Sequence, residues 1–385
     1  MNNYAVNKPY IHRIKAANMY LHQLANWPEF TWDYHQLATK LGEVRHKQGK
    51  ILGQMNAAGF DLKEEALLQT LTLDVIKSSE IEGEILNAEQ VRSSIAKRLG
   101  IPLAGLVHSS RQVDGVVEMM LDATQNYDKP LTADRLYGWH GALFPTGRSG
   151  LYAITVGSWR DDQKGPMQVV SGAIGREKVH FDAPVAGRMP QEMDAFLKWF
   201  NEKQDIDPVI KAGIAHLWFV TIHPFEDGNG RITRALTDML LARADQTELR
   251  FYSMSAQIQK ERNTYYDILE KTQKEGLDIT GWLVWFLDCL DRSMDSTDRI
   301  MEKISIRTHF WNINKKVSLN ARQKKVLDML LDNFFGKLTS SKWAKMTNCS
   351  TDTALRDIQD LVTKGILTPE TAGGRSTSYQ LQRPE

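Results

Sequence analysis

The 385-residue sequence predicts a mostly helical protein with a β-hairpin near its middle and a small mixed module at its end. Stretches with apolar residues at helical spacing dominate the chain, and one Gly- and Val-rich stretch lacks that spacing. The last stretch, residues 310–385, reads as three short helices followed by a β-ribbon. We therefore expect three parts, at residues 1–100, 101–305 and 310–385.

The composition is that of an ordinary soluble protein, with 42% hydrophobic residues, 25% charged residues and a net charge of +1. This balance does not favour a nucleic-acid or membrane binder. Cys289 and Cys349 lie far apart and lack zinc-site spacing, which indicates a reducing compartment. The N-terminus has no signal-peptide core, and no apolar run approaches membrane-spanning length. We expect a cytoplasmic protein.

The N-terminal part is predicted to be helical. In "EEALLQTLTLDVIKSSEIEGEIL" the apolar residues recur close to helical spacing, which predicts a helix over about 67–87. Pro102 and the neighbouring glycines indicate a boundary near residue 100.

Helical patterns resume in the middle part, on both sides of a hairpin. Thr132 is a plausible N-cap, and Asp207 can cap a helix whose first turn holds Pro208. Between these helices, residues 167–171 and 178–181 read as two short strands. The segment "GAIG" between the strands supplies turn glycines, so a hairpin is expected.

A charged stretch, "IHPFEDGNGRITRAL", interrupts two apolar helical segments. Pro224 predicts an extended His223 at the end of the first helix. Gly228 and Gly230 allow backbone N–H groups to approach a ligand closely. The second helix is expected to begin near Arg231, where its free N–H groups and its dipole attract phosphate.

The side chains of this stretch suit phosphoryl or nucleotidyl transfer. Arg231 and Arg234 lie on one side of the first helical turn and can grip two phosphates. Asp227 can hold Mg²⁺ that bridges phosphate oxygens. His223 has a pKa suited to taking a hydroxyl proton at neutral pH. Calcium binding of the EF-hand type is excluded, because Arg231 and Ile232 stand where an acid and a glycine are required.

The segment "HPFEDGNGRITR" matches every fixed position of the Fic-domain signature HPFx(D/E)GNGRxxR. The sequence resembles that family over most of residues 100–300. The resemblance implies a helical Fic core with a β-hairpin flap, and transfer of AMP from ATP to a Ser, Thr or Tyr hydroxyl of a target protein. Transfer of UMP or another phosphate-linked group is an alternative, although the intact Arg234 favours ATP.

The resemblance implies a role for each motif residue. His223 is the general base, Asp227 binds Mg²⁺, and Arg234 holds the γ-phosphate. The anion hole for the α- and β-phosphates is lined by Gly228, Asn229, Gly230 and Arg231. On the adenine side, Tyr266 and Gln273 fall where the family places base-contacting residues, and core packing is the alternative for the tyrosine.

The hairpin resembles the flap of Fic enzymes. Its second strand, made of Lys178, Val179, His180 and Phe181, is expected to pair its backbone with an extended target segment. This pairing would bring a target hydroxyl to His223 whatever the neighbouring side chains. The alternative is an ordinary surface hairpin.

The segment "SSEIEGE" resembles the inhibitory motif (S/T)xxxE(G/N), with Ser78, Glu82 and Gly83 in the fixed places. The resemblance implies that Glu82 pairs with Arg234 and competes with the γ-phosphate of ATP. The alternative is a solvent-facing glutamate. Some related enzymes use this glutamate to remove AMP from targets, so deAMPylation is a possible second activity.

The C-terminal part is predicted to be a winged helix-turn-helix, and with the N-terminal helices it resembles the larger bacterial Fic proteins. A competing function is that of a DNA-binding regulator with a sensing Fic core. Asp352, Asp357 and Asp360 on the third helix would repel DNA phosphates. A role in protein docking or homodimer formation is therefore preferred.

Overall fold

A computed structural model describes residues 4–7, 19–57, 60–102, 105–163, 165–172, 176, 178–332, 334, 336–370 and 377–382. The chain divides into two compact units, Met1–Asp298 and Arg299–Glu385. Helices dominate and the strands are short, which confirms the predicted fold class. The expected N-terminal part and the segment with the charged motif lie within the same compact unit.

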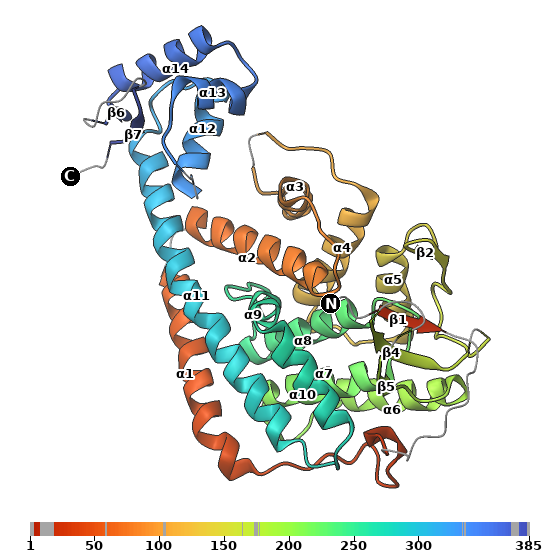
Figure 1. Cartoon of the computed structure of the whole chain (residues 1–385). Helices are drawn as coiled ribbons and strands as arrows, with labels where there is room; N and C mark the ends of the chain where they lie inside the picture. The colour runs from red at the N-terminus through yellow and green to blue at the C-terminus, as the bar shows by residue number, and fades with distance from the viewer. Residues whose placement is uncertain are drawn as a thin grey trace. The chain divides into compact units, whose positions relative to one another are not determined.

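The first unit is a helical assembly with a small sheet at one side (Figure 1). Its helices are α1 Tyr34–Ala57, α2 Phe60–Ile81, α3 Ala88–Leu99, α4 Arg111–Gln125, α5 Ala133–Leu143, α6 Met189–Asn201, α7 Pro208–Ile222, α8 Asn229–Asp245, α9 Met254–Lys260 and α10 Arg262–Gln273. The helix α11, Thr280–Ile313, begins in this unit and continues past the boundary expected at 305–310.

The helices α7 and α8 form the centre of the first unit, and nearly all their side chains are buried. The predicted cap of α7 is confirmed, because the Asp207 side chain accepts from the Val209 N–H at 2.8 Å and Pro208 occupies the first turn. Burial on all faces is the behaviour of a helix at the centre of a large core. The turn between the two helices is therefore held on a rigid support.

Two helix boundaries differ from the predictions. The helix α8 begins at Asn229, earlier than expected, because Gly228 adopts the left-handed φ of 81° that starts the helix. The helix α2 ends at Ile81, whereas the sequence predicted a helix to about 87. Gly83 turns the chain with a φ of 85°, and the Asn87 side chain then caps α3 by accepting from the Gln90 N–H.

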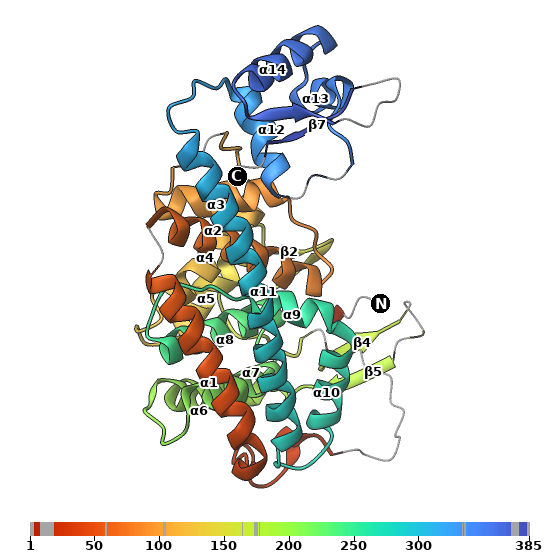
Figure 2. The same cartoon turned by 90° about the vertical axis from the view of Figure 1, so that its left-hand side faces the viewer.

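The expected hairpin is present as β4, Met167–Ser171, and β5, Lys178–Asp182, which pair antiparallel. The N-terminal strand β1, Tyr4–Asn7, pairs with the other edge of β4, so the sheet order is β1-β4-β5. The expected turn residues 173–175 lie outside the described residues. Figure 2 shows the hairpin beside α10. A further pair of strands, β2 Arg148–Ser149 and β3 Tyr152–Ala153, lies earlier in the chain.

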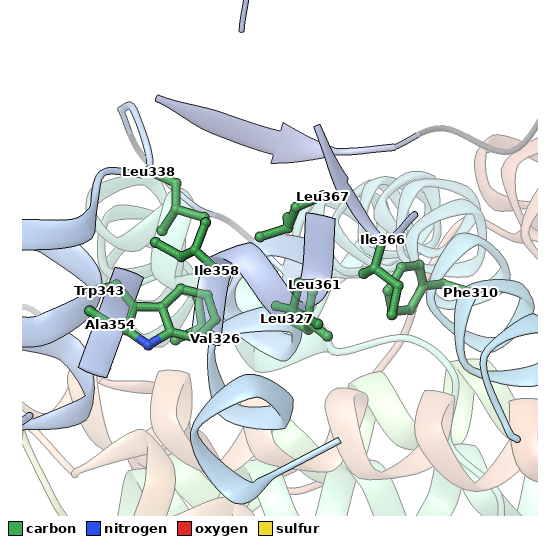
Figure 3. Packing of buried hydrophobic residues seen from close by; sticks show 10 residues of the cluster. All are labelled: Phe310, Val326, Leu327, Leu338, Trp343, Ala354, Ile358, Leu361, Ile366 and Leu367. Carbon is green, nitrogen blue, oxygen red and sulfur yellow. The ribbon is translucent and has the colours of Figure 1, made fainter. Parts of the chain in front are cut away.

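The second unit contains three helices followed by a two-stranded ribbon, in the predicted order. Its elements are α12 Ala321–Asp332, α13 Ser340–Thr347, α14 Thr351–Thr363, β6 Leu367–Pro369 and β7 Tyr379–Leu381. Figure 3 shows its core, where the fully buried Trp343 and Ile358 pack beneath Leu338 and Leu367 near the ribbon. Among the helices that the structure describes, none combines the length and apolar character needed to cross a bilayer.

Candidate active site

His223 ends α7 in a left-handed conformation, with φ 54° and ψ 58°. The sequence correctly placed it at a helix end, but the predicted extended backbone is wrong. The ring Nδ1 lies 3.2 Å from the Val220 carbonyl oxygen, which can only accept, so Nδ1 donates. Burial lowers the pKa of His223 to about 4, although the Val220 hydrogen bond opposes this shift. The ring is therefore neutral at pH 7, with Nε2 able to accept a proton.

Asp227 lies in the turn that follows. Its Oδ1 accepts from the Gly228 N–H at 2.6 Å, and Ser149 of β2 donates its hydroxyl to Oδ2. Within the described part of the chain, no cationic side chain forms an ion pair with this carboxylate, and no cluster of three or more His, Cys, Asp or Glu could hold a metal. A carboxylate without a cationic partner beside an anion-binding helix end fits Mg²⁺ whose other ligands are phosphate oxygens and water.

The Gly-Asn-Gly segment builds the start of α8. Asn229 brackets the backbone of Phe225, donating to its carbonyl at 2.7 Å and accepting from its N–H at 3.0 Å. This pair of bonds closes the turn, so both polar atoms of the Asn229 side chain are hydrogen-bonded to the backbone. A Cβ on Gly228 would lie 2.9 Å from the Phe144 ring, which leaves no room for a larger residue. The first N–H groups of α8, which directly follow Asp227 in sequence, have no partner within the helix.

Arg234 is 2% exposed and is held by the predicted inhibitory segment. Its Nε donates to the Ser78 hydroxyl at 2.9 Å, and its terminal nitrogen donates to the Ser78 carbonyl at 2.8 Å. The same nitrogen lies 2.9 Å from Glu82 Oε1. Burial disfavours the charged guanidinium, but the charge and hydrogen bond of Glu82, together with Tyr265 and Tyr266, outweigh it, so the pKa of Arg234 is raised.

The Glu82 carboxylate also approaches the start of α8. A Cβ built on Gly230 would lie only 2.1 Å from Glu82 Oε1, so the close approach requires glycine at position 230. The left-handed Gly83 follows directly, and Arg262 of α10 donates to the Ile81 carbonyl at 2.8 Å, which fixes the end of α2. The structure thus brings Ser78, Glu82 and Arg234 together, with the carboxylate at the phosphate-attracting end of α8.

Arg231 is paired with a second acidic residue that sequence reasoning missed. Its guanidinium donates to Glu84 Oε2 at 2.6 Å and lies 5.1 Å from the centre of the Phe144 ring. Arg231 is 2% exposed, whereas the Glu84 side chain is 31% exposed. Glu84 stands two positions after Glu82 in the same quoted segment, so its presence beside the motif was the available signal.

The adenine-side residues lie on α10. Tyr266 is half-buried, with the Arg262 guanidinium 5.3 Å from its ring centre, while its neighbour Tyr265 belongs to the core. Gln273 is buried and donates to the Thr221 hydroxyl at 3.2 Å. The roles of Tyr266 and Gln273 in base binding stay predictions.

The predicted flap strand β5 has two kinds of side chain. Lys178 and Val179 are exposed, whereas Phe181 is buried against Met167. His180 contacts the Ser171 hydroxyl and Glu270 of α10. In the described sheet β5 is an edge strand, as expected, and its tie to Glu270 joins the hairpin to the helix that carries Tyr266.

His216 of α7 packs behind Arg234, fully buried, with its ring nitrogens 2.9 Å from Thr237 Oγ1 and 2.9 Å from the Tyr265 hydroxyl. Burial lowers the pKa of His216 to about 3. The folded state therefore excludes a proton that the unfolded chain binds below about pH 6.5, so this group stabilises above that pH and loses its contribution in acid.

We predict that the stability advantage of wild type over His216→Gln shrinks by about 2 kcal/mol between pH 7 and pH 5. Subtracting the free energies of unfolding of the two proteins removes the contributions of the other titrating groups, which both proteins share. Urea unfolding followed by tryptophan fluorescence at each pH measures it. A difference that stays constant between these pH values would show that the pKa of His216 is the same in the folded and unfolded states, so that burial does not lower it.

The acidic residues of the predicted recognition helix lie on α14. Asp357 pairs with Arg322 at 2.7 Å, and Asp360 pairs with Lys364 at 2.5 Å, while Asp352 is exposed. Two of the three acids are thus neutralised within the second unit, and so are two of its basic side chains. Binding of DNA by this unit remains the less favoured of the two predictions made for it.

Comparison with known proteins identifies two segments. A model of the Fic/DOC family matches residues 130–241, and a model of a domain of unknown function, DUF4172, matches residues 20–101. The protein adenylyltransferase Fic of Drosophila grimshawi is 36% identical over 248 residues, which cover 63% of this chain and 45% of that protein. The corresponding protein of Aedes aegypti is 39% identical over 133 residues, covering 33% and 25%.

The chain therefore spans less than half the length of these curated relatives. A crystal structure of a Fic family protein from Desulfovibrio desulfuricans G20 superposes with a TM-score of 0.53 at 18% identity. That match covers 93% of this chain and 99% of the other. It shows that the two chains share a fold.

Proposed function

We propose that this protein is a protein adenylyltransferase that transfers AMP from ATP to a Ser, Thr or Tyr hydroxyl of a target protein. The observation that carries the proposal is the turn between α7 and α8. It brings together a neutral buried imidazole, a carboxylate without a cationic partner, a helix N-terminus and two buried arginines. These are the parts that transfer of a nucleotidyl group requires.

The proposed chemistry follows from these groups. His223 Nε2 takes the proton of the target hydroxyl as its oxygen attacks the α-phosphorus of ATP. The bond from that phosphorus to the bridging oxygen breaks, pyrophosphate leaves, and AMP stays on the target oxygen. The start of α8 stabilises the phosphate charge, and Arg234 binds the γ-phosphate. Mg²⁺ held by Asp227 would neutralise charge on the phosphate oxygens when bound.

We further propose that Glu82 inhibits the enzyme. Its carboxylate is already paired with Arg234 and stands against Gly230, so a γ-phosphate would have to displace it from both. Two anions cannot share one buried guanidinium without mutual repulsion. ATP would then bind only in a poor position for attack until Glu82 moves.

The test uses the full chain as wild type, Glu82→Gly and Glu82→Gly/His223→Ala. Each protein is incubated with Mg²⁺ and ATP labelled at the α-phosphate, alone and with a cell lysate, and protein-bound label is counted. Parallel samples carry ATP labelled at the γ-phosphate, or labelled UTP. AMP transfer is supported if protein is labelled by α-labelled ATP but not by γ-labelled ATP, and if only the Glu82→Gly protein shows this labelling. Label from the γ-position or from UTP would replace the proposal with another transfer.

DeAMPylation is the alternative for the same residues, since Glu82 beside the phosphate site could also orient water. A target labelled by Glu82→Gly is purified and offered to wild-type protein. Release of AMP by wild type and retention by Glu82→Ala would favour that activity.

The ion pair between Glu84 and Arg231 leads to a smaller prediction. We expect Glu84→Gln, in the Glu82→Gly background, to lower the KM for ATP by up to about fivefold, because a partly exposed ion pair competes only weakly. The control is Glu65→Gln, which neutralises a carboxylate of α2 that is 20% exposed and paired with Arg92. An unchanged KM in Glu84→Gln would mean that Glu84 does not compete with ATP, and a raised KM would mean that Arg231 needs its carboxylate partner to bind ATP.

A further inference from the structure

Arg160 lies in the loop before the hairpin and contacts the turn that carries His223. Its backbone N–H donates to the Pro224 carbonyl at 2.9 Å, and its Nε donates to the His223 carbonyl at 2.7 Å. A terminal guanidinium nitrogen donates to the Pro184 carbonyl, two residues beyond the end of β5. One residue thus binds two successive carbonyls of the catalytic turn and ties that turn to the hairpin.

The burial of Arg160 is unusual for a positive charge. Its side chain is 0% exposed, and its ion-pair partner among the described residues is Asp162, 3.4 Å away and itself 37% exposed. Burial lowers the pKa of Arg160 to about 10, although Asp162 opposes the shift. A charge kept inside a protein mainly by neutral carbonyls is costly to retain, which points to a role beyond packing.

The turn that Arg160 holds is strained. His223 is a non-glycine residue with positive φ, and it precedes proline, whose ring disfavours helical conformations in the preceding residue. Such a conformation persists only where the surroundings impose it. Hydrogen bonds to the carbonyls of His223 and Pro224 are a direct means of imposing it.

We propose that Arg160 is a positioning residue, which holds His223 in its left-handed conformation and aligns it with the hairpin. The inference rests on the proposed function of His223 as a base. A lysine retains the charge but lacks the planar fork of donors, so it cannot satisfy the His223 and Pro184 carbonyls in the same geometry. Small displacements of a catalytic group cost large factors in rate.

The chain offers a matched control in Arg243, near the C-terminal end of α8. It is half-buried, burial also lowers its pKa to about 10, and it donates to the Tyr127 and Lys129 carbonyls at 2.6 and 2.9 Å. Arg243 lies twelve residues after Arg231 on the same helix, roughly 18 Å along its axis. Arg243→Lys therefore makes the same chemical change far from the turn.

The experiment compares Arg160→Lys and Arg243→Lys in the full-length Glu82→Gly protein. We expect Arg160→Lys to lower kcat for AMP transfer by about 100-fold, with the KM for ATP unchanged within about twofold, because the phosphate contacts remain. Arg243→Lys should leave kcat unchanged at a similar melting temperature. The proposal would be overturned if Arg160→Lys had the same kcat as its Glu82→Gly parent. It would also be overturned if Arg160→Lys and Arg243→Lys lowered kcat by the same factor.

A spectroscopic measurement tests the same proposal without activity. In ¹⁵N-histidine NMR spectra, the signals of His223 are identified by their absence from His223→Ala. We expect the Nδ1–H tautomer in wild type and Arg243→Lys, and a shift towards the Nε2–H tautomer in Arg160→Lys. Unchanged His223 signals in Arg160→Lys would overturn the positioning role. If Glu82→Gly transferred no AMP while the NMR spectra were as expected, the proposed function would be wrong but the positioning role of Arg160 would stand.

Discussion

Glu82→Gly is expected to raise AMP transfer by about 10- to 100-fold over wild type. The estimate follows from removing one charge-assisted hydrogen-bonded pair, worth about 1.5–3 kcal/mol, that ATP must otherwise displace from Arg234. Initial rates of protein labelling at fixed ATP and Mg²⁺ measure the change. The control is Glu80→Gly, which makes the same substitution two residues earlier, in the last turn of α2, at a residue paired with Lys77 instead.

The same variant should show a second effect, on stability. Without Glu82, the buried Arg234 loses its carboxylate partner, which commonly costs about 3–5 kcal/mol when a charge is left unpaired. We therefore expect a lower melting temperature for Glu82→Gly without nucleotide, and a larger rise on adding ATP than in wild type. Equal labelling by wild type and Glu82→Gly, with equal responses to ATP, would rule out inhibition by Glu82.

His223→Ala in the Glu82→Gly background is expected to reduce transfer by at least about 100-fold, since general-base catalysis contributes factors of 10²–10⁴. Single-turnover labelling measures the rate. Stabilisation by ATP should stay close to that of Glu82→Gly, because His223 does not belong to the phosphate contacts. This separates loss of chemistry from loss of binding.

A histidine far from the turn provides the matched control. His46 of α1 is exposed, and His46→Ala should leave transfer unchanged. If the His223 variant kept most of the activity, another group would have to accept the proton. Asp227 would be the first to examine, because its carboxylate stands in the same turn.

Much of the local structure could be predicted from the sequence because its causes are local. Asp207 and Thr132 cap their helices as predicted, since a side-chain oxygen three or fewer residues from a free N–H needs no distant partner. The hairpin strands were predicted to within a residue, since the turn glycines of "GAIG" separate two short stretches that lack helical spacing. The motif residues were found because their spacing brings them to one turn.

The boundaries that failed depend on single backbone conformations. The end of α2 at Ile81 is set by the left-handed Gly83 and by the cap at Asn87, which together cut short an apolar pattern that continues to Leu86. The left-handed His223 is imposed by Arg160, which lies 63 positions away in sequence. Local preference before a proline predicted the opposite, and tertiary hydrogen bonds overrode it.

The sequence by itself determined the helical class, the hairpin and the chemical inventory of the α7–α8 turn, because short-range spacing and capping decide these features. Only the tertiary structure decided which charges meet. It joins Arg234 to Ser78 and Glu82, Arg231 to Glu84, and the carbonyl of His223 to Arg160. Those contacts link residues 63 to 156 positions apart, and a sequence pattern carries no information on pairs brought together by the packing of separate helices.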